Sequence, residues 1–177
     1  STYFYAFDST DVRRDITLTT YSIDGANNQK GLLLSVLTDG KFRRDWRVPT
    51  LAGTGNCLGY NWPLIRFADV LLMFAETDNE INKGPTAAAV AALREVRQRG
   101  FGGSTTLGQI PTPANQTDMF NGSDSERLLE VGGEGIRKDD LLRWKLLDTE
   151  VTEARANLAR LAGEQAPYTV VPASMEY

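Results

Sequence analysis

The sequence contains no histidine and a single cysteine, Cys57. Histidine is the commonest general base and the commonest transition-metal ligand in proteins, so neither role can rest on an imidazole. With one cysteine and no histidine, a Cys–His nucleophilic pair, an internal disulfide and a thiolate metal cluster are excluded. Cys57 lies in the glycine-rich segment TGNCLGY, where a small buried side chain is its expected role. We predict no cofactor and no metal site.

Long hydrophobic runs and a strong charge of one sign are also absent. The most apolar window, residues 70–75, is far too short to cross a bilayer, and no signal peptide opens the sequence. The 177 residues carry a net charge of −4 without a basic block, so a nucleic-acid partner is not expected. The local arginine clusters are expected on solvated faces or at helix C-termini; they comprise Arg13, Arg14, Arg43, Arg44, Arg47, Arg94, Arg97 and Arg99.

The chain has room for one domain with a sizeable core, and residues 1–60 differ from the rest. Residues 16–23 are β-branched and roughly alternating, which predicts a strand. Residues 24–28 have turn chemistry, and residues 32–38 are compatible with either a second strand or a short buried helix. We expect residues 1–60 to be irregular, with short strands.

Residues 61–165 have a helical pattern. Pro63 suits the first turn of a helix. Residues 64–81 follow, with apolar side chains around most of the circumference, which is typical of a helix buried on several sides. A second, alanine-rich helix over residues 86–99 completes an antiparallel hairpin of tetratricopeptide-like length. Its expected packing side consists of Ala88, Ala92, Leu93 and Val96.

Further helices are predicted after residue 122. The spacing of Ser123 and Glu126 is that of a capping box and predicts that a helix starts there. Gly132 and Gly133 predict a kink or break, because each interior glycine costs about 1 kcal/mol relative to alanine.

A fourth helix is expected over residues 135–149 and a fifth over residues 152–161, followed by an extended tail over residues 166–177. The predicted fold class is therefore mainly α: a helical hairpin of tetratricopeptide-like type plus further helices, with an irregular N-terminal part containing short strands. We interpret residues 1–177 as a single domain or as a fragment of a larger protein.

The segment Ser125–Trp144 places five acidic and four basic side chains among leucines. These charges fall on several helix faces, so some must lie at packed junctions, where a charge is tolerated only if it is paired. Arg66 and Asp69 lie one turn apart on another apolar helix, where we expect a buried structural pair that also bonds to the adjoining helix or loop. The full set that we interpret as structural ion pairs is Arg66, Asp69, Glu76, Glu126, Arg127, Glu130, Glu134, Arg137, Asp140 and Arg143.

Carboxylate pairs among Glu126, Glu130, Glu134 and Asp140 are also compatible with glycosidase acid–base chemistry. The ion-pair interpretation is favoured because arginines in the same segment supply counter-ions. A paired carboxylate has a lowered pKa, whereas a general acid needs a raised one. We therefore assign no catalytic residue.

Aromatic rings can contact the C–H groups of sugars, and exposed rings beside arginines are typical of sugar-binding surfaces. Trp46 follows a charged run and is expected to be exposed, and Tyr60 is a second candidate ligand contact. Trp62 and Trp144 flank apolar helices, so we expect both in the core.

Three ordered motifs resemble the SusD/RagB family of outer-membrane nutrient-binding lipoproteins. Residues 63–76, PLIRFADVLLMFAE, are similar to the family's segment P-x-I-R-Y-A-D-V-L-L-M-Y-A-E. Residues 93–99 resemble its N-x-V-R-x-R helix, although Arg94 replaces the asparagine. Residues 126–144 match its pattern E-R-x-x-E-x-x-x-E-G-x-R-x-x-D-L-x-R-W, and residues 11–13 fit a looser D-x-R sequence.

The resemblance implies the C-terminal portion of a longer protein. Family members begin with a lipoprotein signal and a lipidated cysteine, followed by a series of tetratricopeptide-type helical repeats, and this sequence shows no such beginning. Cys57 lacks a lipobox, so membrane association is expected only through a lipid anchor absent from this chain. Gly132 and Gly133 stand where the family usually has bulkier apolar residues, which is expected to loosen the helix.

The implied function is binding without catalysis. SusD-like proteins capture glycans or other nutrients on the cell surface, at the outer membrane, and deliver them to a TonB-dependent SusC-like transporter. Their sugar contacts lie in variable loops, so no ligand contact transfers to a numbered position. Two alternatives stay open: a helical-repeat scaffold for protein interaction, for which one hairpin is too few, and a carboxylate-dependent glycoside hydrolase.

Overall fold

The computed structural model describes residues 2–24, 26, 28–33, 36–43, 46 and 61–168. Tyr60, Cys57 and residues 169–177, which carry a predicted ligand contact, a predicted buried thiol and most of the predicted tail, lie outside them. In the described part the helices are η1 (Thr2–Ala6), α1 (Arg13–Thr17), α2 (Phe67–Asn82), α3 (Ala87–Gly100), α4 (Gln116–Glu130), α5 (Arg137–Arg143) and α6 (Leu147–Ala162). The predicted fold class, mainly α, is confirmed.

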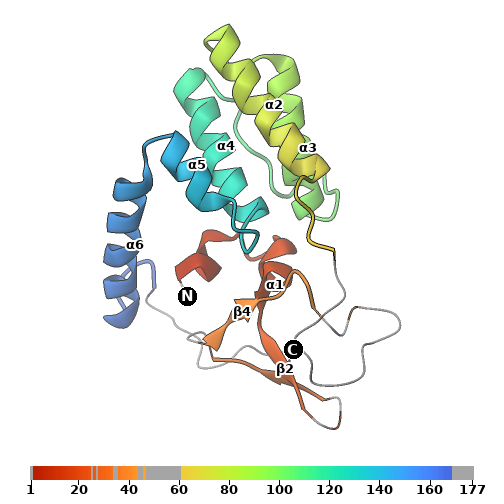
Figure 1. Cartoon of the computed structure of the whole chain (residues 1–177), viewed down its shortest axis with the longest axis vertical. Helices are drawn as coiled ribbons and strands as arrows, with labels where there is room; N and C mark the ends of the chain where they lie inside the picture. The colour runs from red at the N-terminus through yellow and green to blue at the C-terminus, as the bar shows by residue number, and fades with distance from the viewer. Residues whose placement is uncertain are drawn as a thin grey trace.

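Helices α2, α3 and α4 pack together at one end of the molecule, and the N-terminal segment with its strands lies at the other (Figure 1). The predicted hairpin of α2 and α3 is confirmed. It turns at Lys83, whose φ of 55° ends α2, and at Thr86, whose side chain caps α3 by accepting from the Ala89 N–H. The core between the three helices contains Ala68, Leu72, Ala75, Ala89, Val90, Ala92, Leu93, Val96 and Met119. Ala88, predicted to pack, is exposed instead.

Helix α2 begins at Phe67, three residues after its predicted start. Arg66 has an extended backbone, with φ −120° and ψ 154°, and its guanidinium bonds to side chains at the end of α4. Those bonds place Arg66 and the residues before it outside the helix.

Only one side of α2 is buried, so the predicted burial on several sides is wrong for the described part of the chain. The buried side carries Ala68, Asp69, Leu72, Ala75 and Asn79. The opposite side is also apolar but exposed; it carries Phe67, Val70, Phe74 and Ile81. Helix α2 therefore has two apolar faces, of which the described residues cover one.

Helix α4 begins at Gln116, seven residues before the predicted capping box. The Asn115 side chain accepts from the Asp118 N–H at 2.9 Å, and the Asp118 carboxylate accepts from the Ala114 N–H at 3.1 Å. This pair has the same spacing as Ser123 and Glu126, and asparagine is an equally good N-cap residue. The predicted break is confirmed, because α4 ends at Glu130, just before the glycine pair.

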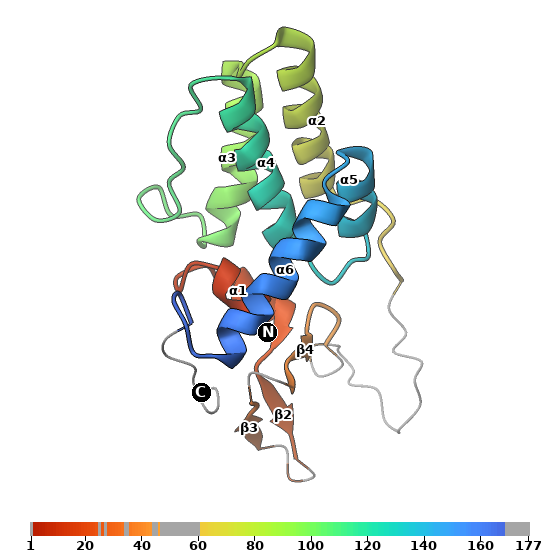
Figure 2. The ribbon, with the colours of Figure 1, turned by 90° about the vertical axis from the view of Figure 1, so that its left-hand side faces the viewer.

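The fourth predicted helix is present as α5, but it is shorter than predicted. Helix α5 ends at Arg143, and Lys145, with φ 60°, turns the chain before α6 starts. Helix α6 includes the predicted fifth helix and begins five residues earlier. Figure 2 shows α6 running from α5 toward the N-terminal segment, and none of its residues is buried.

The predicted strand over residues 16–23 is divided. Helix α1 occupies its start, and the strands β1 (Leu18–Thr19) and β2 (Tyr21–Ile23) follow. β1 pairs antiparallel with β4 (Thr38–Asp39), and β2 with β3 (Gln29–Gly31). The predicted turn is confirmed at Asp24, whose carboxylate accepts from the backbone N–H groups of Ala26 and Asn28. No helix among the described residues has the length and apolarity needed to cross a membrane.

Candidate functional site

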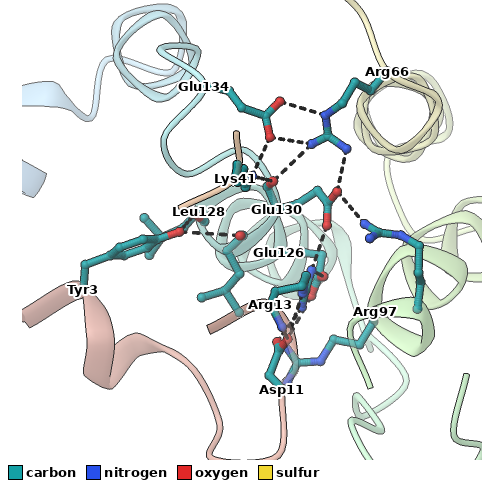
Figure 3. A network of polar contacts seen from close by, with 12 residues as sticks. Tyr3, Asp11, Arg13, Lys41, Arg66, Arg97, Glu126, Leu128, Glu130 and Glu134 are labelled. Carbon is teal, nitrogen blue, oxygen red and sulfur yellow. Dashed lines mark hydrogen bonds and ion pairs between the residues drawn. The ribbon is translucent and has the colours of Figure 1, made fainter. Parts of the chain in front are cut away.

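Glu130, at the end of α4, lies at the centre of a cluster of buried charge (Figure 3). Its carboxylate accepts from Arg13 Nη1 at 3.0 Å and from Arg66 Nη1 at 2.9 Å. A third guanidinium, that of Arg99, lies with Nη2 2.5 Å from Glu130 Oε1. Three cations from three different parts of the chain therefore share one buried carboxylate.

Two further glutamates extend this cluster, which we call the Glu130 cluster. Glu126 pairs with Arg13 at 2.5 Å and with Arg97 at 3.2 Å. Glu134 pairs with Arg66 at 2.8 Å and with Lys41 at 2.5 Å. The cluster consists of Asp11, Arg13, Lys41, Arg66, Arg97, Arg99, Glu126, Glu130 and Glu134.

Local structure explains why these acids meet. Glu126 and Glu130 are four residues apart on α4, so their side chains share a face of the helix. Glu134 follows the turn made by Gly132 and Gly133, and its carboxylate meets the same Arg66 guanidinium as Glu130. Arg66 reaches both because it lies outside α2 in an extended conformation.

A second cluster, the Arg127 cluster, joins α2, α4 and α5. The Arg127 side chain is 2% exposed and bonds to Asp69 Oδ1 at 2.8 Å and to Asp140 Oδ2 at 2.7 Å. Arg143 bonds to Asp140 at 3.0 Å and forms a bidentate ion pair with Glu76. Trp144 Nε1 donates to the same Glu76 carboxylate at 2.7 Å.

All ten residues of the predicted ion-pair set form ion pairs in this structure. Arg137, outside both clusters, bonds to Asp124 at 2.5 Å and lies 3.8 Å from Glu150. Arg66 and Asp69 bond to adjoining segments, as expected, but the expected pair between them is wrong, because each bonds to a different partner. Side chains one turn apart on a helix share a face, but Arg66 lies before the helix begins.

The ionic environment lowers the pKa of two of these carboxyls. Burial alone acts to raise the pKa of Glu130, but the charges and hydrogen bonds of Arg99, Arg66 and Arg13 outweigh it. Burial likewise opposes the lowered pKa of Glu76, where bonds from Arg143 and Trp144 prevail. A lowered pKa keeps a carboxylate charged, whereas a general acid at neutral pH needs a raised one.

Sequence reasoning missed Asp11, Arg13, Lys41, Arg97 and Arg99 as members of the Glu130 cluster. Arg13 was expected on a solvated face, but it is buried and bonds to three carboxylates. One signal was available. Glutamates at four-residue spacing share one face of a helix, so a neighbouring segment packed on that face can supply their counter-ions.

A cavity of about 210 Å³ lies beside the Glu130 cluster. Charged side chains of the cluster form much of its wall, and an isoleucine, a threonine, a phenylalanine and a proline complete it. The lining residues are Arg13, Ile16, Thr17, Lys41, Phe42, Pro63, Arg66, Arg99, Glu130 and Glu134.

Two tryptophans among the described residues are exposed. Trp46 is 49% exposed, as predicted, and the Arg43 guanidinium lies 4.7 Å from its ring centroid. Trp62 is 53% exposed, so its predicted place in the core is wrong; it precedes α2, and its ring centroid lies 4.7 Å from that of Phe42. Trp144 is half-buried and packs edge-on against Phe120.

The model of the SusD family matches residues 10–174. The chain belongs to the SusD family. The resemblance predicted from the three motifs is therefore confirmed. Among the described residues of this SusD-family chain, no group of three or more carboxylate or thiol side chains is placed to hold a metal ion.

Two relatives are similar to this chain over part of their own length. SusD-like protein P25 of Formosa agariphila is 38% identical over 84 residues, which are 48% of this chain and 15% of P25. A SusD homologue of known structure from Bacteroides thetaiotaomicron superposes with a TM-score of 0.77 and 26% identity. That match covers 97% of this SusD-family chain and 36% of the homologue, so the chain spans about a third of its solved relative.

Proposed function

We propose that this chain is part of a longer SusD-family protein that binds a glycan or another nutrient at the outer membrane without catalysis. One observation carries the non-catalytic part of the proposal. Glu126, Glu130, Glu134 and Asp140, the carboxylates that a hydrolase would need, all bond to cations. A carboxylate held by arginines is a poor proton donor.

The proposed ligand contacts are aromatic. Trp46 presents about half of its surface to solvent, and the stacked Arg43 guanidinium holds one side of its ring. A tryptophan ring fixed in this way can contact a sugar ring over a large area with little loss of side-chain entropy. Tyr60, the second sequence candidate, remains a proposed contact.

The partner proposed from the family is a TonB-dependent SusC-like transporter, to which the bound nutrient is delivered. The proposed location is the cell surface, where the protein is held by a lipid anchor outside this sequence.

The exposed apolar face of α2 supports a longer protein. A helix with two apolar faces is typical of a helix buried between neighbours, and the solved relative has almost two thirds of its chain beyond this match. We infer that a helix from the rest of the protein covers Phe67, Phe74 and Ile81. A protein-interaction scaffold would leave this face open for a separate partner.

Affinity electrophoresis of the whole protein in gels containing polysaccharides tests the binding proposal. We expect retardation by at least one polysaccharide and no release of reducing sugar. Trp46→Ala is expected to weaken retardation, and Trp46→Phe, which keeps a ring, to preserve most of it. Reducing sugar that disappears in Glu130→Gln or Glu134→Gln would instead establish a hydrolase.

Co-purification from outer membranes tests the partner. We expect a large transporter barrel to be retained with the tagged whole protein. Recovery of a soluble partner that is lost on substitution of Phe74 would favour the scaffold.

A further inference from the structure

The Glu130 cluster carries more positive than negative charge. Its cations are Arg13, Lys41, Arg66, Arg97 and Arg99, and its acids are Asp11, Glu126, Glu130 and Glu134, so five positive charges face four negative ones. The chain as a whole has a net charge of −4. The positive excess is therefore a local property of this region.

Arg99 has unused donors among the described residues. Its side chain is 55% exposed, and its one ion pair in the described part of the chain joins Nη2 to Glu130 Oε1. Arg66, by contrast, uses all three guanidinium nitrogens on Glu130 and Glu134. A guanidinium has five N–H donors, so Arg99 can bind a second carboxylate without giving up Glu130.

Arg99 also lines the 210 Å³ cavity, and Phe42 and Pro63 are among its other lining residues. Trp62 precedes that proline, contacts Phe42 and is about half exposed. A cavity of this size holds a carboxylate and part of a sugar ring rather than a whole oligosaccharide. An exposed tryptophan therefore lies beside a small cavity with unused cationic donors.

We propose that this cavity is a subsite for the carboxylate of an acidic sugar, a hexuronate, with the sugar ring against Trp62. The inference rests on the proposed glycan-binding function and narrows its ligand class. The uronate carboxylate binds Arg99 and balances the excess charge of the cluster. A neutral sugar would leave the partly buried cationic donors without an anion and would bind more weakly.

Isothermal titration calorimetry of the whole protein with trigalacturonate and with neutral galactotriose tests the subsite. We expect trigalacturonate to bind more tightly, and its Kd to rise at least fivefold between 50 and 300 mM NaCl, because salt screens the ionic contact. Arg99→Gln is expected to weaken trigalacturonate binding at least tenfold and to leave galactotriose binding unchanged. Arg155→Gln, on exposed α6, removes the same charge elsewhere and serves as the matched control.

A second variant, Trp62→Ala, lies outside the ion cluster and is expected to weaken binding of both sugars at least fivefold. The melting temperature of each variant shows whether it folds. Unchanged trigalacturonate binding in folded Arg99→Gln would overturn the subsite, and so would tight galactotriose binding without trigalacturonate binding. In both cases the proposed glycan-binding function survives. If no polysaccharide or oligosaccharide is bound, that function fails together with the subsite.

Discussion

Replacing Arg127 by methionine tests the idea that the buried charges hold the helices together. Arg127 is almost completely buried and bonds to Asp69 on α2 and to Asp140 on α5. Methionine keeps most of the volume of the arginine stem, so the change mainly removes charge and hydrogen bonds. It leaves two buried carboxylates without the cation between them.

The expected loss of unfolding free energy is large. Removing one partner of a buried ion pair costs about 3–5 kcal/mol, because the remaining charge is stranded away from water. Asp140 retains Arg143 at 3.0 Å, whereas Asp69 has no other ion-pair partner in the described part of the chain. We therefore expect about 3–5 kcal/mol, rather than twice that amount. For a chain of this size this lowers the melting temperature by roughly 10 °C.

Urea unfolding followed by circular dichroism measures this loss. Lys138→Met is the matched control, since it removes the same charge from an exposed position on α5 and should change stability by less than about 0.5 kcal/mol. Adding Asp69→Asn to Arg127→Met should recover part of the loss, because the stranded charge is then gone. A loss below about 1 kcal/mol in Arg127→Met, or no recovery in the double variant, would refute the reasoning.

Three other outcomes are expected. The lowered pKa values of Glu130 and Glu76 mean that their ionised forms stabilise the fold. This contribution is complete above the unfolded carboxyl pKa of about 4.5 and is lost as pH falls through the lower folded values. Melting temperatures measured from pH 7 to pH 3 should therefore decrease below about pH 5, and the decrease should be smaller in Glu76→Gln. Gly132→Ala should lower stability by about 1–3 kcal/mol in urea unfolding, because the new Cβ would lie 1.9 Å from Tyr3 Oη. Alanine at Gly84, where a Cβ meets nothing within 4 Å, should be tolerated. Phe74→Ser should lower the stability of the 177-residue chain by less than about 1 kcal/mol but that of the longer protein by about 3 kcal/mol. The reason is that the outer face of α2 is proposed to be covered only in the longer protein. Equal losses in both would contradict the proposed cover.

The elements best predicted from sequence are those governed by local rules. The hairpin follows from the apolar period of α2 and α3, and the end of α4 follows from Gly132 and Gly133. The starts of helices were poorly predicted because two N-caps competed for α4 and because tertiary bonds hold Arg66 in an extended conformation. The hydrophobic pattern of the sequence indicates neither the competing N-cap nor the extended conformation of Arg66.

The charged residues were likewise predictable where local sequence decides and unpredictable where tertiary packing decides. Dense charge among leucines was enough to expect ion pairs at Arg127 and Glu130. The sequence could not indicate which charges meet, because Arg13 and Glu130 are 117 residues apart and come together only through the packing of α1 on α4. Trp62 was misplaced for a related reason: it was expected in the core because it flanks an apolar helix, but that helix begins only after Arg66.

The glycine pair after α4 links the fold to the charged cluster. It was expected to loosen the helix, but both residues lie where other chain segments approach closely. Tyr3 Oη donates to the Leu128 carbonyl at 2.8 Å beside Gly132, and Gly133, with φ +78°, faces the Asp39 carboxylate. A side chain at either position would meet these groups, so glycine is what allows the N-terminal segment to reach the end of α4.

Ending α4 at Glu130 also leaves its last carbonyl groups without partners in the helix. The Glu130 carbonyl accepts from Lys41 Nζ at 2.5 Å and from Arg66 Nη2 at 3.1 Å. Cations are favoured at this position because the C-terminus of a helix carries partial negative charge. The same two side chains also bond to Glu134, which the glycine turn brings back toward them. The break in the helix therefore creates the acceptors around which the Glu130 cluster gathers, and with them the cationic wall of the neighbouring cavity.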